Sequence, residues 1–275
     1  MLVDLHMHTY FSDGTMSPEE LVDKAKELGL GLIAVADHNT IDAYHRAKVA
    51  CDESNIEILT AVEIDTMLHG KKFHLLAYDF EINNKELIQI INDCDAKIKH
   101  GIDMIMRNMA VDFDEINLTE YENYTYDLRR GGHKYSNYLI DKGIISSYTE
   151  GRPLFKSYKL PVTELGLPQM KEVCRAVKIA GGYSILAHPG CKLNKDRVLI
   201  DLKEALKAGI DGVECFYPEH TEEITNLCVN FSNQHGLLVT SGCDEHGDWG
   251  IYHIGTMKID SAKLRLKRIG KVVTD

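Results

Sequence analysis

The sequence lacks the features that would assign it to a membrane-bound or disulfide-rich class. No segment reaches the roughly 18 consecutive apolar residues of a membrane span, and the N-terminal apolar run contains Asp4 and has no basic flank, unlike a signal peptide. The seven cysteines are odd in number and form no Cys-x-x-Cys pair, which argues against a disulfide framework and against a structural zinc knuckle. We therefore expect reduced, mostly buried thiols and a cytoplasmic location.

An excess of basic charge is also missing. The 31 Lys and Arg residues are outnumbered by 42 Asp and Glu residues, which gives a formal net charge of -11. This balance disfavours a broad basic groove for long nucleic acid. The 275 residues are 44% hydrophobic and 27% charged, an ordinary globular composition that is large enough for one barrel-sized domain or two smaller ones.

Alternating strand and helix patterns predict an α/β fold. Strands are expected at 2–5, 30–36, 56–64, 72–78, 183–187, 212–216 and 237–241, and helices at 17–28, 40–52, 168–180, 196–208 and 219–235. Residues 81–165 are richer in Asn, Asp, Lys and Tyr, with helical patterns near 84–107 and 133–142. Repeated βα units favour a parallel sheet or barrel, here formed by residues 1–80 and 166–275, and residues 81–165 are expected to form an inserted, mainly helical lobe.

Candidate metal ligands gather at or just after the ends of the expected strands. They are His6, His8 and Asp13 after the first strand, His38 after the second, Glu63 closing the third, His74 within the fourth, His188 after the fifth, and Asp244 with His246 after the last. Residues i and i+2 of an extended segment face the same side, so His6 and His8 can point at one ion. Loops at the carboxyl ends of parallel strands converge on the active site in barrels and open sheets.

Some of these signals also have an ordinary structural explanation. Asp37-His38-Asn39 could cap the next helix, His188-Pro189-Gly190 could form a turn, and His74 could be a core histidine. Together, however, six histidines and three carboxylates exceed what one ion needs, since zinc takes about four ligands and manganese about six. The set predicts two or three divalent ions, with Glu63 as a candidate bridge. Manganese, iron and zinc all suit these ligands.

Several motifs follow one another in a recognisable order. They are His6-x-His8-Thr9 with Phe11-Ser12-Asp13-Gly14, Ala36-Asp37-His38-Asn39, Glu63, His188-Pro189, Glu214 with Tyr217-Pro218-x-His220, and Gly242-Cys243-Asp244-Glu245-His246-Gly247. This series resembles the PHP (polymerase and histidinol phosphatase) family, above all its small branch of nucleoside 3',5'-bisphosphate phosphatase and of 5'-to-3' exoribonuclease of the TrpH/RNase AM type. The resemblance implies a distorted (β/α)7 barrel with a trinuclear metal centre and a helical insertion.

The resemblance also implies residue roles. It assigns His6, His8, Glu63 and Asp244 to one metal, Glu63, His74 and His188 to a second, and Asp13, His38 and His246 to a third. Asp37 and Glu214 would orient ligands from outside. The branch commonly has Arg-Pro-His where this chain reads Arg129-Arg130-Gly131-Gly132-His133, so Gly131 stands at the arginine position. The usual Ser-Asp-Phe-His is here Cys243-Asp244-Glu245-His246, which keeps both ligands.

The leading hypothesis is hydrolysis of a phosphomonoester or terminal phosphodiester by a metal-bound hydroxide. The substrate would be a small nucleotide, such as a nucleoside 3',5'-bisphosphate or a short 5'-phosphorylated oligoribonucleotide, and no membrane partner is expected. Arg129 or Arg130 would clamp a phosphate with His133 nearby, and His220 would contact phosphate or protonate the leaving oxygen. The alternatives are a histidinol-phosphate phosphatase and a non-catalytic metal-binding regulatory module. Five histidines match no motif and receive no role: His45, His69, His100, His235 and His253.

Overall fold

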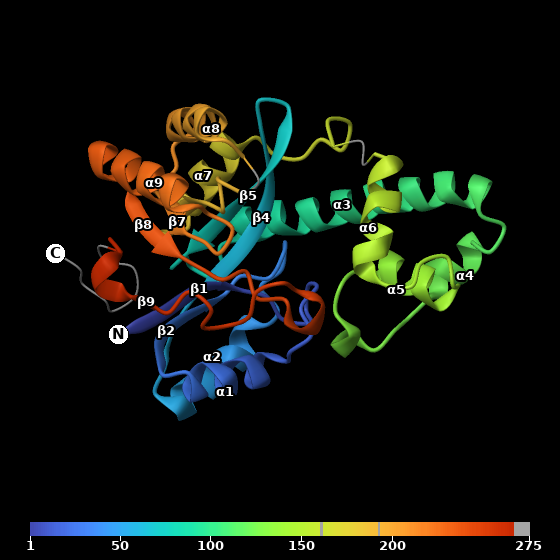
Figure 1. Cartoon of the computed structure of the whole chain (residues 1–275), viewed down its shortest axis with the longest axis horizontal. Helices are drawn as coiled ribbons and strands as arrows, with labels where there is room; N and C mark the ends of the chain where they lie inside the picture. Colours follow the sequence, from blue (N-terminus) through green and yellow to red (C-terminus); the bar gives the residue numbers. More distant parts are fainter. Residues whose placement is uncertain (160–161, 192, 267–275) are drawn as a thin grey trace.

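The strands of the chain form two sheets (Figure 1). The structure is a computed structural model that describes residues 1–159, 162–191 and 193–266. The first sheet has the order β3-β2-β1-β9, from β3 (Glu57–Leu59), β2 (Leu30–Val35), β1 (Leu2–Met7) and β9 (Ile259–Asp260). The second has the order β4-β5-β6-β7-β8, from β4 (Ala61–Leu68), β5 (Lys71–Tyr78), β6 (Tyr183–Leu186), β7 (Gly212–Phe216) and β8 (Leu238–Ser241).

Five helices that alternate with the strands lie on the outside of the sheets (Figure 1). They are α1 (Pro18–Glu27) and α2 (Tyr44–Ser54) beside the first sheet, and α7 (Met170–Ile179), α8 (Lys195–Ala208) and α9 (Glu222–His235) beside the second. The start of α1 illustrates the local cause, because Glu20 N donates to the Ser17 hydroxyl while Ser17 N donates to the Glu20 carboxylate. The order of these helices and strands along the chain confirms the predicted mixed α/β fold.

The two sheets meet through short contacts and do not form one closed ring of strands. His8 N donates to Glu245 O at 2.9 Å, which links the end of β1 to the segment after β8. Asn39 N donates to Glu63 O at 2.8 Å and Glu63 N to Asp37 O at 3.2 Å, which links the end of β2 to β4. In the described part of the chain, the fold is therefore confirmed as α/β, whereas a closed (β/α)7 barrel is not.

The single strand predicted at 56–64 is wrong. The chain leaves the first sheet after β3 and enters the second at β4, with Thr60 between them. Thr60 is held at this break, since its hydroxyl donates to Phe80 O and its carbonyl accepts from Asp79 N, each at 2.9 Å. The inward-facing residues of β3 and of β4 are apolar. The hydrophobic pattern of the sequence is therefore the same on both sides of Thr60 and does not mark the change from one sheet to the other.

The main core fills the space between the sheets and their helices. Leu5, Leu32, Ile64 and Leu76 are fully buried there, and each such side chain contributes about 1.5–3 kcal/mol by leaving water. Tyr78 is also fully buried, and its hydroxyl donates to Leu5 O at 2.6 Å. This bond ties β5 of the second sheet to β1 of the first at Leu5, the residue before His6.

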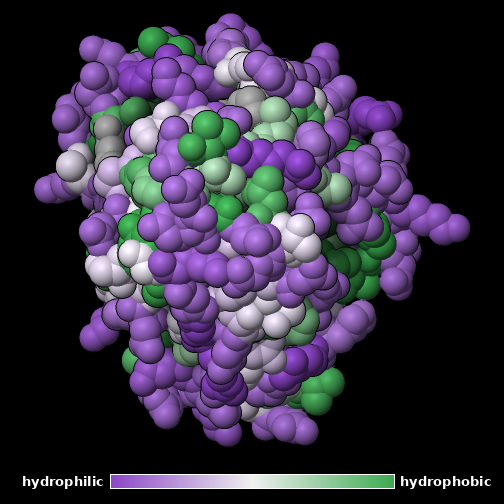
Figure 2. Space-filling view, turned by 90° about the vertical axis from the view of Figure 1, so that its right-hand side faces the viewer, coloured by the Kyte–Doolittle hydropathy of each residue, from purple (hydrophilic) through white to green (hydrophobic). Residues whose placement is uncertain are grey.

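The insertion forms a helical lobe at one end of the molecule (Figure 1). The lobe consists of α3 (Lys85–Asp112), α4 (Leu118–Asn123), α5 (Lys134–Asp141) and α6 (Tyr148–Ser157), and α3 is longer than predicted. A separate apolar cluster that includes Ile105, Met106, Tyr138 and Leu139 holds it together. The end face of the lobe is mainly hydrophilic, with apolar side chains in small groups (Figure 2). Among the described residues, no helix combines the length and apolarity that crossing a membrane requires.

Candidate metal centre

The structure brings all nine predicted ligands into one connected cluster. Glu63 lies at its centre with no exposed surface. Its Oε2 lies 3.2 Å from His6 Nε2, 3.4 Å from His8 Nε2 and 3.1 Å from His38 Nδ1, and its Oε1 lies 2.8 Å from His74 Nδ1 and 3.0 Å from His188 Nε2. One buried carboxylate thus faces five imidazole rings from four separate parts of the chain.

The remaining ligands join this centre through their own contacts. Asp244 Oδ1 lies 3.0 Å from His8 Nε2, and Asp13 Oδ1 lies 3.3 Å from His246 Nε2. Three groups have ligand atoms that all lie within 4.8 Å of one another: His6, His8, Glu63 and Asp244; His8, Asp13, His38 and His246; and His38, Glu63 and His74. The first group equals a predicted set. The second group equals the predicted set of Asp13, His38 and His246 with His8 added. The third equals the predicted set of Glu63, His74 and His188, except that His38 takes the place of His188.

The chemistry of His6 and Glu63 fits a bound cation. The Glu214 carboxylate can only accept, so His6 Nδ1, 3.0 Å away, carries the hydrogen and His6 Nε2 points a lone pair at Glu63 Oε2. Both of these atoms are buried, and neither has a hydrogen-bond partner among the described residues. The lone pairs of His6 Nε2 and Glu63 Oε2 repel each other unless a positive charge lies between them. A proton can take this role, because the neighbouring carboxylates outweigh burial and raise the pKa of His6 well above its ordinary value.

The field of the whole cluster favours cations. Burial alone would raise the pKa of Glu63 and of Asp244, but the surrounding imidazoles hold both well below the ordinary range. Burial would lower the pKa of His74 and of His246, but Glu63 raises that of His74 to about 9 and Asp13 raises that of His246 to about 10. The carboxylates therefore stay ionised at neutral pH, ready to bind divalent cations.

The ligands sit differently on the strands from what the sequence predicted. His6 lies inside β1, because β1 pairs with β2 as far as Met7 opposite Val35. Glu63 is the third residue of β4 and not the end of a strand. His188 and Asp244 do follow strands, with left-handed φ angles of 25° and 58°. The ligands thus converge because two sheets approach each other, and not because one row of strand ends supplies them all.

Two buried carboxylates support the cluster from outside. Glu214, on β7, accepts from His6 Nδ1 and also from His188 N at 2.8 Å, so it orients both residues. Asp37 accepts from Thr9 N and the Thr9 hydroxyl, each at 2.7 Å, and from the Ser12 hydroxyl at 2.6 Å. The Ser12 oxygen lies 3.4 Å from His8 Nδ1, so Asp37 acts on this imidazole through the loop.

Of the predicted substrate contacts, the structure brings only His133 to the cavity beside the cluster. His133 Nε2 lies 3.6 Å from Asp13 Oδ2. His220 donates from Nδ1 to Cys215 O and accepts at Nε2 from Gly190 N, both at 3.0 Å, so both ring nitrogens are occupied by backbone. Arg129 pairs with Glu20 at 2.7 Å and Arg130 pairs with Asp141, and both arginines lie outside the lining of the cavity.

The cavity is a cleft of about 1070 Å³ between the cluster and the helical lobe. Lys72 and Asp65, which the sequence analysis did not single out, also line it: Lys72 Nζ contacts the Asp65 carboxylate and lies 3.1 Å from His74 Nε2. A signal was present, since Asp65 follows Glu63 by two residues and Lys72 precedes His74 by two, which puts each pair on one face of a strand. The lobe adds Arg152, which forms no ion pair among the described residues.

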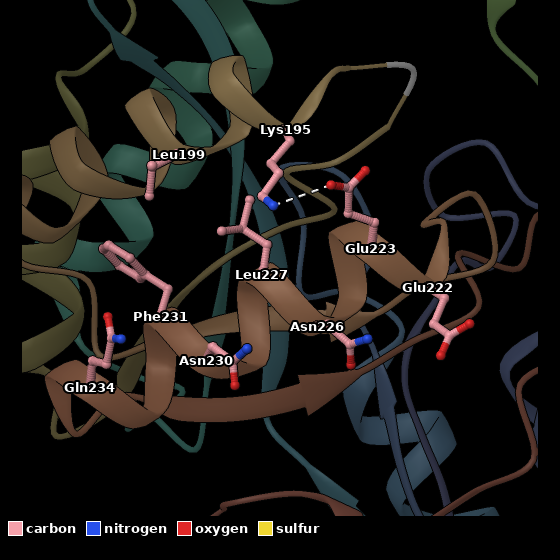
Figure 3. Close-up of a pocket in the computed structure, with 9 residues that line it drawn as sticks. All are labelled: Lys195, Leu199, Glu222, Glu223, Asn226, Leu227, Asn230, Phe231 and Gln234. Atoms are coloured by element: carbon pink, nitrogen blue, oxygen red, sulfur yellow. Dashed lines mark ion pairs between the residues drawn. The ribbon is translucent and has the colours of Figure 1, made fainter.

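Aromatic rings line the same cleft. Tyr148 and Trp249 have ring centroids 4.4 Å apart, and Tyr135 stacks on Phe155 at 3.8 Å. A second pocket lies on the outer surface between α8 and α9 and shares no residue with the cleft (Figure 3). Its Lys195 and Glu223 already pair with each other at 3.2 Å, so this pocket offers no comparable chemistry.

Comparisons with known proteins agree with this arrangement. The PHP domain profile matches residues 4–140. The chain carries a PHP domain over these residues. This PHP chain is 26% identical over 270 residues to a 5'-3' exoribonuclease of Haemophilus influenzae, covering 92% of each. It is 24% identical over 271 residues to the phosphoribosyl 1,2-cyclic phosphate 1,2-diphosphodiesterase of Eggerthella lenta, covering 93% of this chain and 98% of that one.

Two further relatives complete the comparison. The 3',5'-nucleoside bisphosphate phosphatase of Chromobacterium violaceum is 23% identical over 260 residues, covering 89% of this chain and 87% of that one. A crystal structure from Bifidobacterium adolescentis, assigned to the metal-dependent phosphoesterases, superposes with a TM-score of 0.80 at 25% identity, covering 94% and 92%. The PHP chain is thus a metal-dependent hydrolase of phosphate esters. None of these four relatives is named as a histidinol-phosphate phosphatase or as a non-catalytic module.

Proposed function

We propose that this enzyme hydrolyses a phosphate ester of a small nucleotide, either a nucleoside 3',5'-bisphosphate or the 5' end of a short oligoribonucleotide. The observation that supports the proposal is that the cluster opens into a cleft that is also lined by aromatic rings, among them Tyr135, Tyr148 and Trp249. A phosphate suits the cluster end, and a base suits the aromatic end. The names of the relatives from Haemophilus and Chromobacterium support the same substrate class.

Two or three divalent ions, manganese, iron or zinc, would be held by the nine clustered residues. The proposed ligands are His6, His8, Asp13, His38, Glu63, His74, His188, Asp244 and His246. When bound, such ions lower the pKa of a water toward neutrality and neutralise charge on the phosphoryl oxygens. The chain itself fixes the ligands, because Glu214 keeps the hydrogen of His6 on Nδ1 and leaves Nε2 free for the metal.

Cations that line the cleft would bind the phosphates. Lys72 is next to the cluster and would contact the phosphate that is hydrolysed, with His133 on the opposite side near Asp13. Arg152, on the lobe, would hold a second phosphate with its guanidinium, which matches two phosphate oxygens.

The helical lobe, residues 81–165, would cover the substrate and bind its base. Tyr135 and Tyr148 bring rings to the cleft from α5 and α6, and stacking of a base on an aromatic ring contributes about 1–3 kcal/mol. Stacking tolerates any base, so we expect weak base preference. The seven cysteines form no disulfide among the described residues and six of them are buried, which supports a reducing cytoplasmic compartment for this enzyme.

A parallel assay tests the proposed function. Phosphate and nucleotide release would be measured with manganese from adenosine 3',5'-bisphosphate, a 5'-phosphorylated oligoribonucleotide, phosphoribosyl 1,2-cyclic phosphate and histidinol phosphate. We expect turnover of one or both of the first two, and turnover of only the last two would contradict the proposal.

Matched arginine variants then identify the phosphate contact. Arg152→Gln should raise KM for the bisphosphate by about tenfold, the worth of one charge-assisted hydrogen bond. Arg129→Gln is the control, because this exposed side chain pairs with Glu20. A raised KM in Arg129→Gln alone would favour the arginine that the sequence predicted.

A further inference from the structure

Asp13 joins three parts of the molecule. Its carboxylate belongs to the metal-ligand cluster, while its carbonyl oxygen accepts two hydrogen bonds, from Trp249 Nε1 at 2.6 Å and from Gly132 N at 2.7 Å. Gly132 belongs to the lobe, and Trp249 belongs to the turn that follows His246. A single backbone oxygen therefore links the lobe and this turn to a candidate ligand of the cluster.

The indole of Trp249 spans the same junction. Its ring centroid lies 4.9 Å from that of His246 on one side and 4.4 Å from that of Tyr148, the first residue of α6, on the other. The chain contains no other tryptophan. The ring thus contacts both a candidate metal ligand and a helix of the lobe.

Gly131 makes room for this indole. A Cβ at position 131 would lie 2.5 Å from both Cδ1 and Nε1 of Trp249 and 2.7 Å from Thr15 Cγ2, and the residue has a φ of +63°. Any side chain would therefore displace the indole. This explains in physical terms why glycine occupies the position at which the family pattern has arginine.

We propose that Trp249 is a positioning residue that clasps the helical lobe to the metal-ligand cluster through the Asp13 carbonyl and the space left by Gly131. Asn137 Nδ2 donates to Gly131 O at 2.8 Å, which carries the clasp into α5. The clasp holds His133 beside Asp13 and sets the width of the cleft where the substrate lies. Its effect on turnover rests on the proposed function, whereas the clasp itself is a property of the folded chain.

Two variants remove the clasp from opposite sides. Trp249→Phe keeps a ring but loses the N–H, and we expect KM for the bisphosphate to rise about threefold to tenfold. KM for p-nitrophenyl phosphate, which has neither a second phosphate nor a base for the lobe to hold, should change less than twofold. Gly131→Ala should expel the indole and lower kcat/KM for the bisphosphate by about a hundredfold, as expected for a misplaced substrate. Because both act on one clasp, their combined effect should be smaller than the product of the separate effects.

A control variant at another glycine of the lobe, together with two measurements that need no substrate, tests the clasp itself. Gly143→Ala is the control, since Gly143 lies in the same lobe with a φ of +69° and its Cβ would meet nothing within 4 Å. The tryptophan emission should shift to longer wavelength in Gly131→Ala and stay unchanged in Gly143→Ala. Hydrogen exchange at residues 131–139 should accelerate in Trp249→Phe. Equal emission in the two glycine variants, or unchanged exchange in Trp249→Phe, would overturn the proposal even if the enzyme acts on other substrates.

Discussion

Replacing Glu214 by glutamine should weaken metal binding although Glu214 is not a proposed ligand. Both of its carboxylate oxygens are in use, one by His6 Nδ1 and one by His188 N. Glutamine offers one acceptor oxygen and an NH2 group, so one of these two donors loses its partner. If that donor is His6, its hydrogen moves to Nε2, the atom that faces Glu63.

The size of the effect follows from these contacts. A lost partner of this kind typically costs 10- to 100-fold in metal affinity, which equals about 1.4–2.8 kcal/mol. The free manganese concentration that gives half-maximal activity should therefore be 10- to 100-fold higher in Glu214→Gln than in the wild type. At saturating manganese the activity of the variant should recover. Glu204→Gln is the matched control, because Glu204 pairs with His69 at the surface, with 3.2 Å between Oε2 and Nε2. A manganese dependence of Glu214→Gln equal to that of the wild type would refute the reasoning.

Three further predictions concern protons, thiols and packing. Metal ligation needs neutral imidazole, and carboxylates raise the pKa of His74 to about 9 and that of His246 to about 10 against the effect of burial. Calorimetry should therefore show proton release on manganese binding at neutral pH, and the affinity should keep rising with pH towards 9 to 10, where these imidazoles lose their protons. Six of the seven cysteines are buried, so a thiol reagent should modify about one site in the native protein, Cys191, and all seven after unfolding. Tyr78→Phe leaves the buried Leu5 carbonyl without its donor and should lower the free energy of unfolding in urea by about 1–2 kcal/mol.

The sequence predicted the identities of the clustered residues better than their arrangement. Alternating apolar runs locate β1, β2 and β5, and His6 and His8 converge as the period of a strand requires. The break at Thr60 was not predictable in this way, because the apolar pattern is the same before and after it. The register between the two sheets, which places Glu63 among the imidazoles, depends on contacts between segments far apart in the chain.

Substrate contacts were harder to predict for a related reason. Arg129 and Arg130 stand in the expected segment of sequence, but carboxylates of the surface, Glu20 and Asp141, hold their guanidinium groups. Arg152 lies on α6, which the sequence did not predict, so its place in the cleft could not be inferred. A charged side chain at a surface pairs with whatever the folded chain brings near it, and the local sequence does not record those partners.

The nine clustered residues should bind the metal ions that the active enzyme uses. Anomalous X-ray scattering from crystals grown with manganese tests this most directly. We expect two or three anomalous peaks, each about 2.0–2.3 Å from nitrogen and oxygen atoms of the clustered residues, with at least one peak contacting Glu63. Peaks confined to the outer surface, or no peak within the cluster in an enzyme that is active under the same conditions, would contradict the account.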